Sequence, residues 1–177
     1  MEHSLVVLTG ASGSGKTTLA RHVQLCYPLA VDVIFFDSIG VPPIDQMARD
    51  CGSPEAWQRA QTQTWFGKIS KILATGRTVL FEGQMRIAFI VEALAEVGIT
   101  GARLILVDCD DDVRQGRVKN DRNQPELANP TMMHWAKYLR EEAKTADIEI
   151  LDTGSLSVTD CTTYPCRCLR TPAEASK

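Results

Sequence analysis

A glycine-rich stretch near the N-terminus limits what this chain can fold into more than any other feature of its sequence. Residues 10–18 read GASGSGKTT and fit the phosphate-binding pattern G-x-x-x-x-G-K-[ST] without a mismatch. The apolar run at residues 5–8 leads into the stretch, and residues 18–23 have the pattern of a helix that leaves it. In such a strand–loop–helix unit, glycines let backbone N–H groups converge on phosphates, and the helix N-terminus adds positive charge. The stretch therefore predicts a nucleotide-binding loop.

Two side chains of this loop have specific expected roles. Lys16 is expected to reach the β- and γ-phosphates of ATP, and the Thr17 hydroxyl is expected to bind Mg²⁺. A glycine-rich hairpin is the structural alternative, which the flanking strand and helix patterns disfavour. The residues expected to contact the nucleotide are Gly10, Ala11, Ser12, Gly13, Ser14, Gly15, Lys16, Thr17 and Thr18.

Composition narrows the class of protein. A chain of 177 residues, 44% hydrophobic and 23% charged, is typical of one soluble globular domain, here spanning residues 1–177. The net charge of −3 makes nucleic acid an unfavourable partner. No apolar run approaches the roughly 20 residues of a membrane span and no export leader is visible, so we expect a cytoplasmic protein without membrane contact. We expect free thiols at the six scattered cysteines, and a monomer or homodimer.

Apolar runs alternate with helical patterns along the chain. Such alternation predicts an α/β fold: a three-layer α/β/α arrangement around a five-stranded parallel, doubly wound sheet. A polar, mobile loop at about residues 120–130 and a flexible tail at about 165–177 complete the expected organisation. Strands are expected at 5–8, 31–36, 78–81, 102–107 and 148–151, and helices at 18–26, 53–75, 86–97, 111–119 and 131–146.

Acidic residues close two of the expected strands. Asp37 follows the second strand and Glu82 follows the third. Ligands bind such sheets outside the carboxyl ends of the strands. We therefore expect both residues at the same edge as the loop at 10–18.

Over about residues 4–155 the chain resembles the small P-loop kinases, the superfamily of shikimate, gluconate, nucleoside and nucleotide kinases and antibiotic phosphotransferases. The motif at 10–17 is the specific part of this resemblance. The segment VLFEG at 79–83, followed by Arg86, also resembles broader kinase-like families that include zeta-type toxins and polynucleotide 5′-kinases. The resemblance implies a P-loop NTPase fold with a short lid at about residues 112–130. The glycine-rich run of shikimate kinases and the paired arginines of nucleoside monophosphate kinases are not found, which leaves the substrate class open.

The resemblance implies roles for the strand-end acids. Asp37 occupies the position of an aspartate that contacts the substrate hydroxyl and often serves as the base; a polar strand end or helix cap is the alternative. Glu82 occupies the position that faces the Mg²⁺ shell; a salt bridge or substrate contact is the alternative. Arg86 is expected to bind an anionic group of the substrate or to be a surface residue.

Three arginines fall in the expected lid. Arg114 and Arg117 lie three residues apart and share one helix face. We expect Arg117 to act in catalysis and Arg114 to bind the nucleotide, with a solvated charged face as the alternative. Arg122 lies in the polar loop and is expected to contact the substrate.

These features predict an ATP- and Mg²⁺-dependent kinase that transfers a phosphoryl group to an alcohol. The acceptor is expected to be a small hydroxylated molecule, and nucleosides and nucleotides are among the candidates. Two alternatives stay open. The first is an ATP-hydrolysing regulatory switch, which needs no base facing an acceptor. The second is a polynucleotide 5′-kinase, which needs a basic groove.

Overall fold

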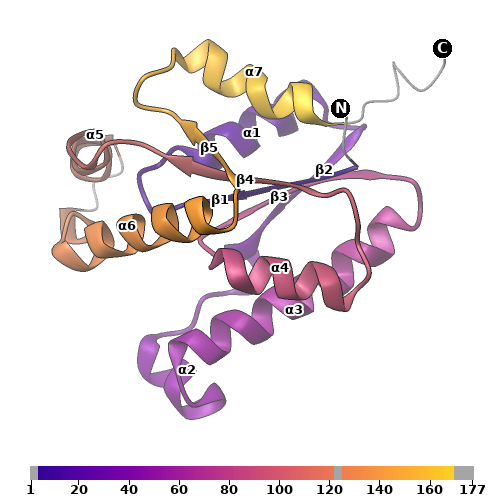
Figure 1. Cartoon of the computed structure of the whole chain (residues 1–177), viewed down its shortest axis with the longest axis horizontal. Coiled ribbons are helices and arrows are strands. Elements are labelled where there is room, and N and C mark those ends of the chain that lie inside the picture. The colour runs from indigo at the N-terminus through magenta and orange to yellow at the C-terminus, as the bar shows by residue number, and fades with distance from the viewer. Residues whose placement is uncertain (1–3, 122–124, 170–177) are drawn as a thin grey trace.

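A five-stranded parallel sheet forms the centre of the computed structural model, which describes residues 4–121 and 125–169 (Figure 1). The spatial order is β2-β3-β1-β4-β5, and every neighbouring pair is parallel. The prediction of an α/β fold with a five-stranded parallel sheet is confirmed. The strands are β1 (Leu5–Thr9), β2 (Val31–Phe35), β3 (Thr78–Gly83), β4 (Arg103–Asp108) and β5 (Glu149–Asp152).

Helices cover both faces of the sheet. The α1 and α7 helices lie on one face, and α3, α4 and α6 lie on the other (Figure 1). Short helical turns lie at Phe36–Ile39 (η1), Arg117–Asp121 (η2) and Pro125–Leu127 (η3). The helices are α1 (Lys16–Cys26), α2 (Ile44–Cys51), α3 (Pro54–Leu73), α4 (Ile87–Glu96), α5 (Asp111–Gly116), α6 (Pro130–Thr145) and α7 (Val158–Cys168).

The central strands are apolar along their middle because both of their faces are covered, and their polar residues lie near the strand ends. Successive side chains point to opposite faces of a strand. Leu5 and Val7 of β1 therefore join the core under α3, α4 and α6, whereas Val6 and Leu8 join the core under α1 and α7. This packing fixes the position of β1 and of the loop that follows it.

Two helices begin at residues suited to capping. The Ser53 hydroxyl accepts a hydrogen bond from the Ala56 N–H at 3.0 Å before α3, and the Asn129 side chain accepts one from the Met132 N–H at 2.9 Å before α6. Both helices then start with proline, which is favourable at the first helical position. These caps fix where α3 and α6 begin.

The structure corrects the expected tail and adds two helices. The α7 helix continues through Pro165 to Cys168, so the prediction of a flexible tail is wrong for residues 165–169, and residues 170–177 lie outside the described residues. Burial of Cys168 and Leu169 against the sheet outweighs the interruption that Pro165 causes in the helix. The α2 helix was also not predicted. Within the described ranges, no helix combines the length and the apolar character that a membrane span requires.

Candidate active site

The glycine-rich loop connects β1 to α1 at the carboxyl edge of the sheet (Figure 1). Gly15 precedes α1 with a φ of 94°, a left-handed conformation that glycine adopts without strain. Lys16 begins the helix and is buried. The first N–H groups of a helix have no partner within the helix, and the first turn of α1 contains no acidic residue. This terminus is therefore suited to an external anion.

Thr17 and Glu82 form the candidate metal site. The Thr17 hydroxyl donates to Oε1 of Glu82 at 3.2 Å, and Glu82 is only 6% exposed. Mg²⁺ prefers oxygen ligands and is usually bound by one or two carboxylates together with substrate phosphates. No cluster of three or more His, Cys, Asp or Glu side chains suited to a metal occurs among the described residues. The oxygen pair beside the loop fits a nucleotide-bound Mg²⁺.

Asp37 lies exposed in η1, directly after β2. The strand register places Phe35 opposite Glu82, so Asp37 follows at the same edge as the candidate metal ligands. Gly83 lies so close to η1 that a Cβ atom there would be 2.4 Å from Cβ of Phe36. Trp65 also donates from its indole N–H to the Phe36 carbonyl at 3.2 Å. These contacts fix the turn that carries Asp37.

Arg114 lies behind the loop and is fully buried. Its guanidinium donates to the Ser12 carbonyl at 3.1 Å, to the Cys109 carbonyl at 3.0 Å and to the Asp108 carboxylate. Arg140 of α6 donates to the other Asp108 oxygen at 2.6 Å, and this hydrogen bond raises the pKa of Arg140. The contacts of Arg114 lie within the protein, where they brace the loop, rather than over the position expected for phosphates.

Arg117 lies beside the loop and is half-buried. It donates to the Thr153 hydroxyl at 2.8 Å, to the Thr153 carbonyl at 3.0 Å and to the Gly13 carbonyl at 3.4 Å. The Thr153 hydroxyl donates in turn to the Ser14 carbonyl at 2.8 Å. A hydrogen bond from the Gly154 N–H lowers the pKa of neighbouring Asp152. Arg122, the third expected lid arginine, lies outside the described residues.

Arg86 directly precedes α4 at the same edge. Its backbone N–H donates to Oε1 of Gln58 at 3.3 Å, and its guanidinium is paired with Glu55 at 3.4 Å. The side chain also lies against the Trp135 and Tyr138 rings of α6. The structure thus places Arg86 at the same edge of the sheet as the loop and adds aromatic neighbours that its sequence position did not indicate.

Asp108, Arg140 and Gln84 were not predicted as site residues. Asp108 closes β4 as Glu82 closes β3, and this strand-end position is a signal that could have identified it. Gln84 accepts a hydrogen bond from the Ser12 hydroxyl at 3.2 Å, a contact between residues 72 positions apart that no local pattern indicates.

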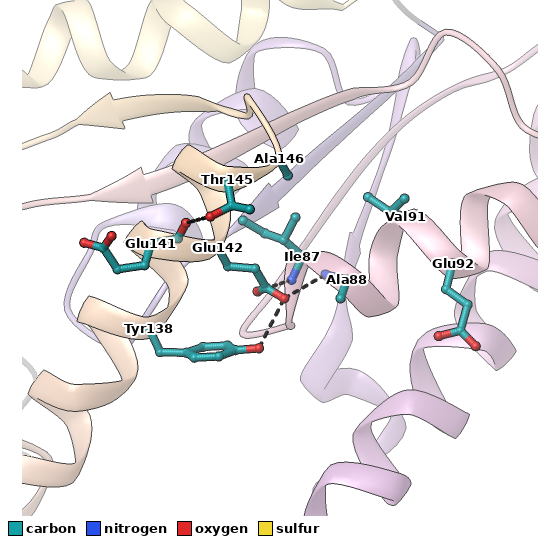
Figure 2. Close-up of a pocket in the computed structure, with 9 residues that line it drawn as sticks. All are labelled: Ile87, Ala88, Val91, Glu92, Tyr138, Glu141, Glu142, Thr145 and Ala146. Atoms are coloured by element: carbon teal, nitrogen blue, oxygen red, sulfur yellow. Dashed lines mark hydrogen bonds between the residues drawn. The ribbon is translucent and has the colours of Figure 1, made fainter.

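A separate groove of about 560 Å³ lies between α4 and α6 (Figure 2). Glu142 of α6 accepts hydrogen bonds there from the N–H groups of Ile87 and Ala88 at 2.8 and 3.0 Å, and from the Tyr138 hydroxyl at 3.2 Å. A carboxylate at a helix N-terminus is stabilised by the helix dipole. None of the predicted site residues lines this groove, which therefore belongs to the α4–α6 packing.

The chain matches the sequence model of one protein family, described as an AAA domain, over residues 6–146. A search of curated protein sequences finds no relative. Among solved structures, shikimate kinase from Acinetobacter baumannii in complex with shikimate has a TM-score of 0.60 at 14% identity, covering 92% of this chain and 90% of that one.

Two nucleotide-bound structures are similar to the same degree. APS kinase from Mycobacterium tuberculosis in complex with AMPPNP and APS has a TM-score of 0.61 at 15% identity, with 95% and 98% of the two chains covered. Deoxyadenosine kinase from M. mycoides with bound dATP has a TM-score of 0.60 at 13% identity, with 92% and 97% covered. At these identities the likeness is one of fold. The chain belongs to the AAA domain family, and its fold is that of the small P-loop kinases.

Proposed function

We propose that this protein is an ATP- and Mg²⁺-dependent phosphotransferase that transfers the γ-phosphoryl group of ATP to a hydroxyl group of a small molecule. One arrangement carries the proposal. The Thr17–Glu82 oxygen pair lies beside the phosphate-binding loop, and Asp37 follows the adjacent strand at the same edge. A metal-nucleotide site and a candidate base on neighbouring strands are what transfer to a hydroxyl requires.

Each residue of the site has a specific role in the proposed phosphoryl transfer. Lys16 and the α1 N-terminus bind the phosphates, and Thr17 and Glu82 would hold Mg²⁺, which when bound would neutralise charge on the transferred group. Asp37 orients the acceptor hydroxyl and takes its proton as the oxygen bonds to the γ-phosphorus and ADP leaves. Arg117 stabilises the charge of the transition state.

A panel experiment tests the proposal. ADP formation with Mg²⁺ and ATP is measured against nucleosides, sugars, hydroxy acids and antibiotics for the wild type and for Asp37→Asn. Asp32→Asn is the matched control, because Asp32 lies at the other end of β2 and pairs with Arg77. We expect an acceptor-dependent rate that falls about 100-fold or more in Asp37→Asn only.

Two other outcomes would overturn the proposal. A slow rate that is equal in all three proteins and independent of the panel would instead indicate a regulatory switch. Transfer only to DNA or RNA 5′ ends, with binding that weakens steeply with salt, would indicate a polynucleotide kinase. The cytoplasmic location and the monomeric or homodimeric state stay predictions.

A further inference from the structure

Two thiols from different helices meet on the face of the sheet that α1 and α7 cover. Cys26 is the last residue of α1, and Cys166 lies in the last turn of α7. The two helices lie side by side (Figure 1), and Cys166 packs against the core to which Leu19 and Val23 of α1 belong. A side-chain hydrogen bond joins Cys166 to Cys26. The fold thus brings together two thiols that are far apart in the chain.

Cys26 is the thiol of this pair that solvent reaches. Its side chain is exposed, and its Sγ atom lies 3.3 Å from Nε2 of His22. His22 precedes Cys26 by four residues, so the two side chains share one face of α1. An imidazole nitrogen in this position can take the thiol proton, and the thiolate is the form that reacts with oxidants. An oxidant in solution therefore meets Cys26 first.

Cys166 has the surroundings of a second, slower thiol. Burial raises the pKa of the Cys166 thiol to about 11, and the charge and the hydrogen bond of Cys26 add to this effect. A protonated, half-buried thiol reacts slowly with an oxidant from solvent. It is nevertheless in contact with Cys26, and redox-sensitive cysteines often lie beside such a resolving cysteine. The two positions therefore differ as the two steps of disulfide formation require.

The end of α7 is a place where a covalent link would change the stability of the fold. Pro165 directly precedes Cys166 and removes a helix hydrogen bond, so this turn depends on packing. The α7 helix also follows the turn at Thr153, whose hydroxyl accepts from Arg117 and donates to the Ser14 carbonyl of the loop. A link between Cys26 and Cys166 closes a loop of about 140 residues, and cross-links that close long loops restrict the unfolded chain most.

We propose that Cys26 and Cys166 form a reversible disulfide when the protein meets a peroxide, and that this disulfide clamps α7 to α1. The Cys26 thiolate attacks one oxygen of hydrogen peroxide, the O–O bond breaks, and the leaving hydroxide takes a proton to become water. The Cys166 sulfur then attacks the resulting sulfenic sulfur and loses its proton, and the S–O bond breaks to release a second water. The two thiols are oxidised and one peroxide is reduced, with no other reactant. This inference does not depend on the proposed function.

Peptide mass spectrometry tests the disulfide directly. The full chain is reduced, freed of reductant and treated with hydrogen peroxide, and the remaining thiols are then blocked with iodoacetamide. After digestion with trypsin, we expect the peptides of residues 22–49 and 145–167 to be linked and to separate on treatment with dithiothreitol. The absence of this link, or a link that joins two copies of the chain, would overturn the inference.

Variants identify the two sulfur atoms and provide the controls. Cys26→Ser and Cys166→Ser should each lose the link, whereas Cys51→Ser, at a half-buried thiol of α2, should keep it. The second peptide also contains Cys161, which is buried, so Cys161→Ser should keep the link as well. If Cys161→Ser fails to fold, fragmentation of the linked wild-type peptides identifies the bridged cysteine. A link that survives in Cys166→Ser would overturn the inference. His22→Phe should slow the formation of the link by about threefold or more.

Thermal unfolding tests whether the disulfide acts as a clamp. The peroxide-treated wild type should unfold with a Tm about 5 °C or more above that of the reduced protein, and dithiothreitol should reverse this rise. Cys26→Ser given the same treatment should show no rise. Equal Tm values for the linked and the reduced wild type would overturn the clamp. None of these measurements requires ATP or an acceptor, so their outcome and that of the panel experiment are independent.

Discussion

The Thr17 hydroxyl donates a hydrogen bond to Oε1 of Glu82 across 3.2 Å. This contact joins the loop after β1 to the end of the neighbouring strand, at residues 65 positions apart. The parallel register pairs Leu8 with Glu82, so the two backbones lie side by side and the two oxygen atoms meet without strain in the loop.

We expect Glu82→Gln to raise the Mg²⁺ concentration for half-maximal turnover by about tenfold or more, because an amide oxygen carries no charge. Thr17→Ser keeps the hydroxyl and should change this concentration by less than about threefold. Turnover measured against Mg²⁺ concentration gives both values. Glu92→Gln, at a partly exposed carboxylate of α4, is the control. An unchanged Mg²⁺ requirement in Glu82→Gln would contradict the assignment.

Lys16→Ala should weaken ATP binding by about 100-fold or abolish turnover, because the ammonium group is expected to pair with the phosphates. Calorimetry with ATP and Mg²⁺ measures the affinity. Lys71→Ala, at an exposed residue of α3, should bind ATP as the wild type does. Equal affinity and equal turnover in Lys16→Ala and the wild type would refute the assignment of the loop.

Arg117→Ala should lower kcat by about 100-fold while raising the dissociation constant of ATP by less than about fivefold, because the charge it stabilises develops in the transition state. Steady-state kinetics and direct ATP binding measure the two effects separately. Thr153→Val removes one acceptor of Arg117 and should give a smaller loss in kcat. If ATP affinity falls more than kcat, Arg117 is a ground-state contact.

Arg114→Met should lower the free energy of unfolding by about 3 to 5 kcal/mol, because it leaves the buried Asp108 carboxylate without one of its two arginine partners. Urea denaturation measures the loss. Arg77→Met breaks an exposed pair with Asp32 and should cost no more than about 1 kcal/mol. Equal losses in the two variants would show that Arg114 does not brace the loop.

Burial raises the pKa of Cys166 to about 11, with the neighbouring Cys26 adding to the effect. The thiolate is the reactive form, so we expect alkylation of Cys166 to lag behind that of exposed Cys26 between about pH 7 and 9. Peptide mass spectrometry after timed iodoacetamide treatment measures this order. The unfolded chain releases this proton at lower pH than the folded chain, so the contribution of Cys166 to stability falls as pH rises from about 9 toward 11. Faster alkylation of Cys166 would contradict its burial.

The strands and the loop could be predicted because their signals are local. Continuous apolar runs identified the buried strands, and the motif at 10–18 fixed the glycine-rich loop. The meeting of Thr17 and Glu82 followed from the parallel order of the strands. The α2 helix spans only eight residues and has a single buried residue, Met47, although Ile44, Met47 and Cys51 recur at helical spacing, a signal that the sequence prediction missed. In α7, Pro165 in the sequence argued against a helix, and the helix nevertheless forms because its buried residues pack against the core under α1.

The side-chain network around the loop could not be predicted for a different reason. Arg140 reaches Asp108 across 32 positions, and the Trp135 ring lies against Arg86 although the two residues are even farther apart in the chain. These contacts depend on how α6 packs against β4 and α4, which sequence spacing does not determine. The expectation that Arg114 contacts the nucleotide followed from its place in the lid that the resemblance implies and from helix spacing, and neither shows which way an arginine side chain turns.

The carboxylate of Glu142 at the start of α4 has a consequence for selectivity. Both α1 and α4 begin at the carboxyl edge of the sheet, where helix dipoles attract negative groups. Glu142 accepts the hydrogen bonds of the first two N–H groups of α4 and so leaves no place there for a phosphate, whereas the first turn of α1 contains no acidic residue. Under the proposed function, the polyphosphate of ATP would therefore bind at the α1 terminus and not at that of α4.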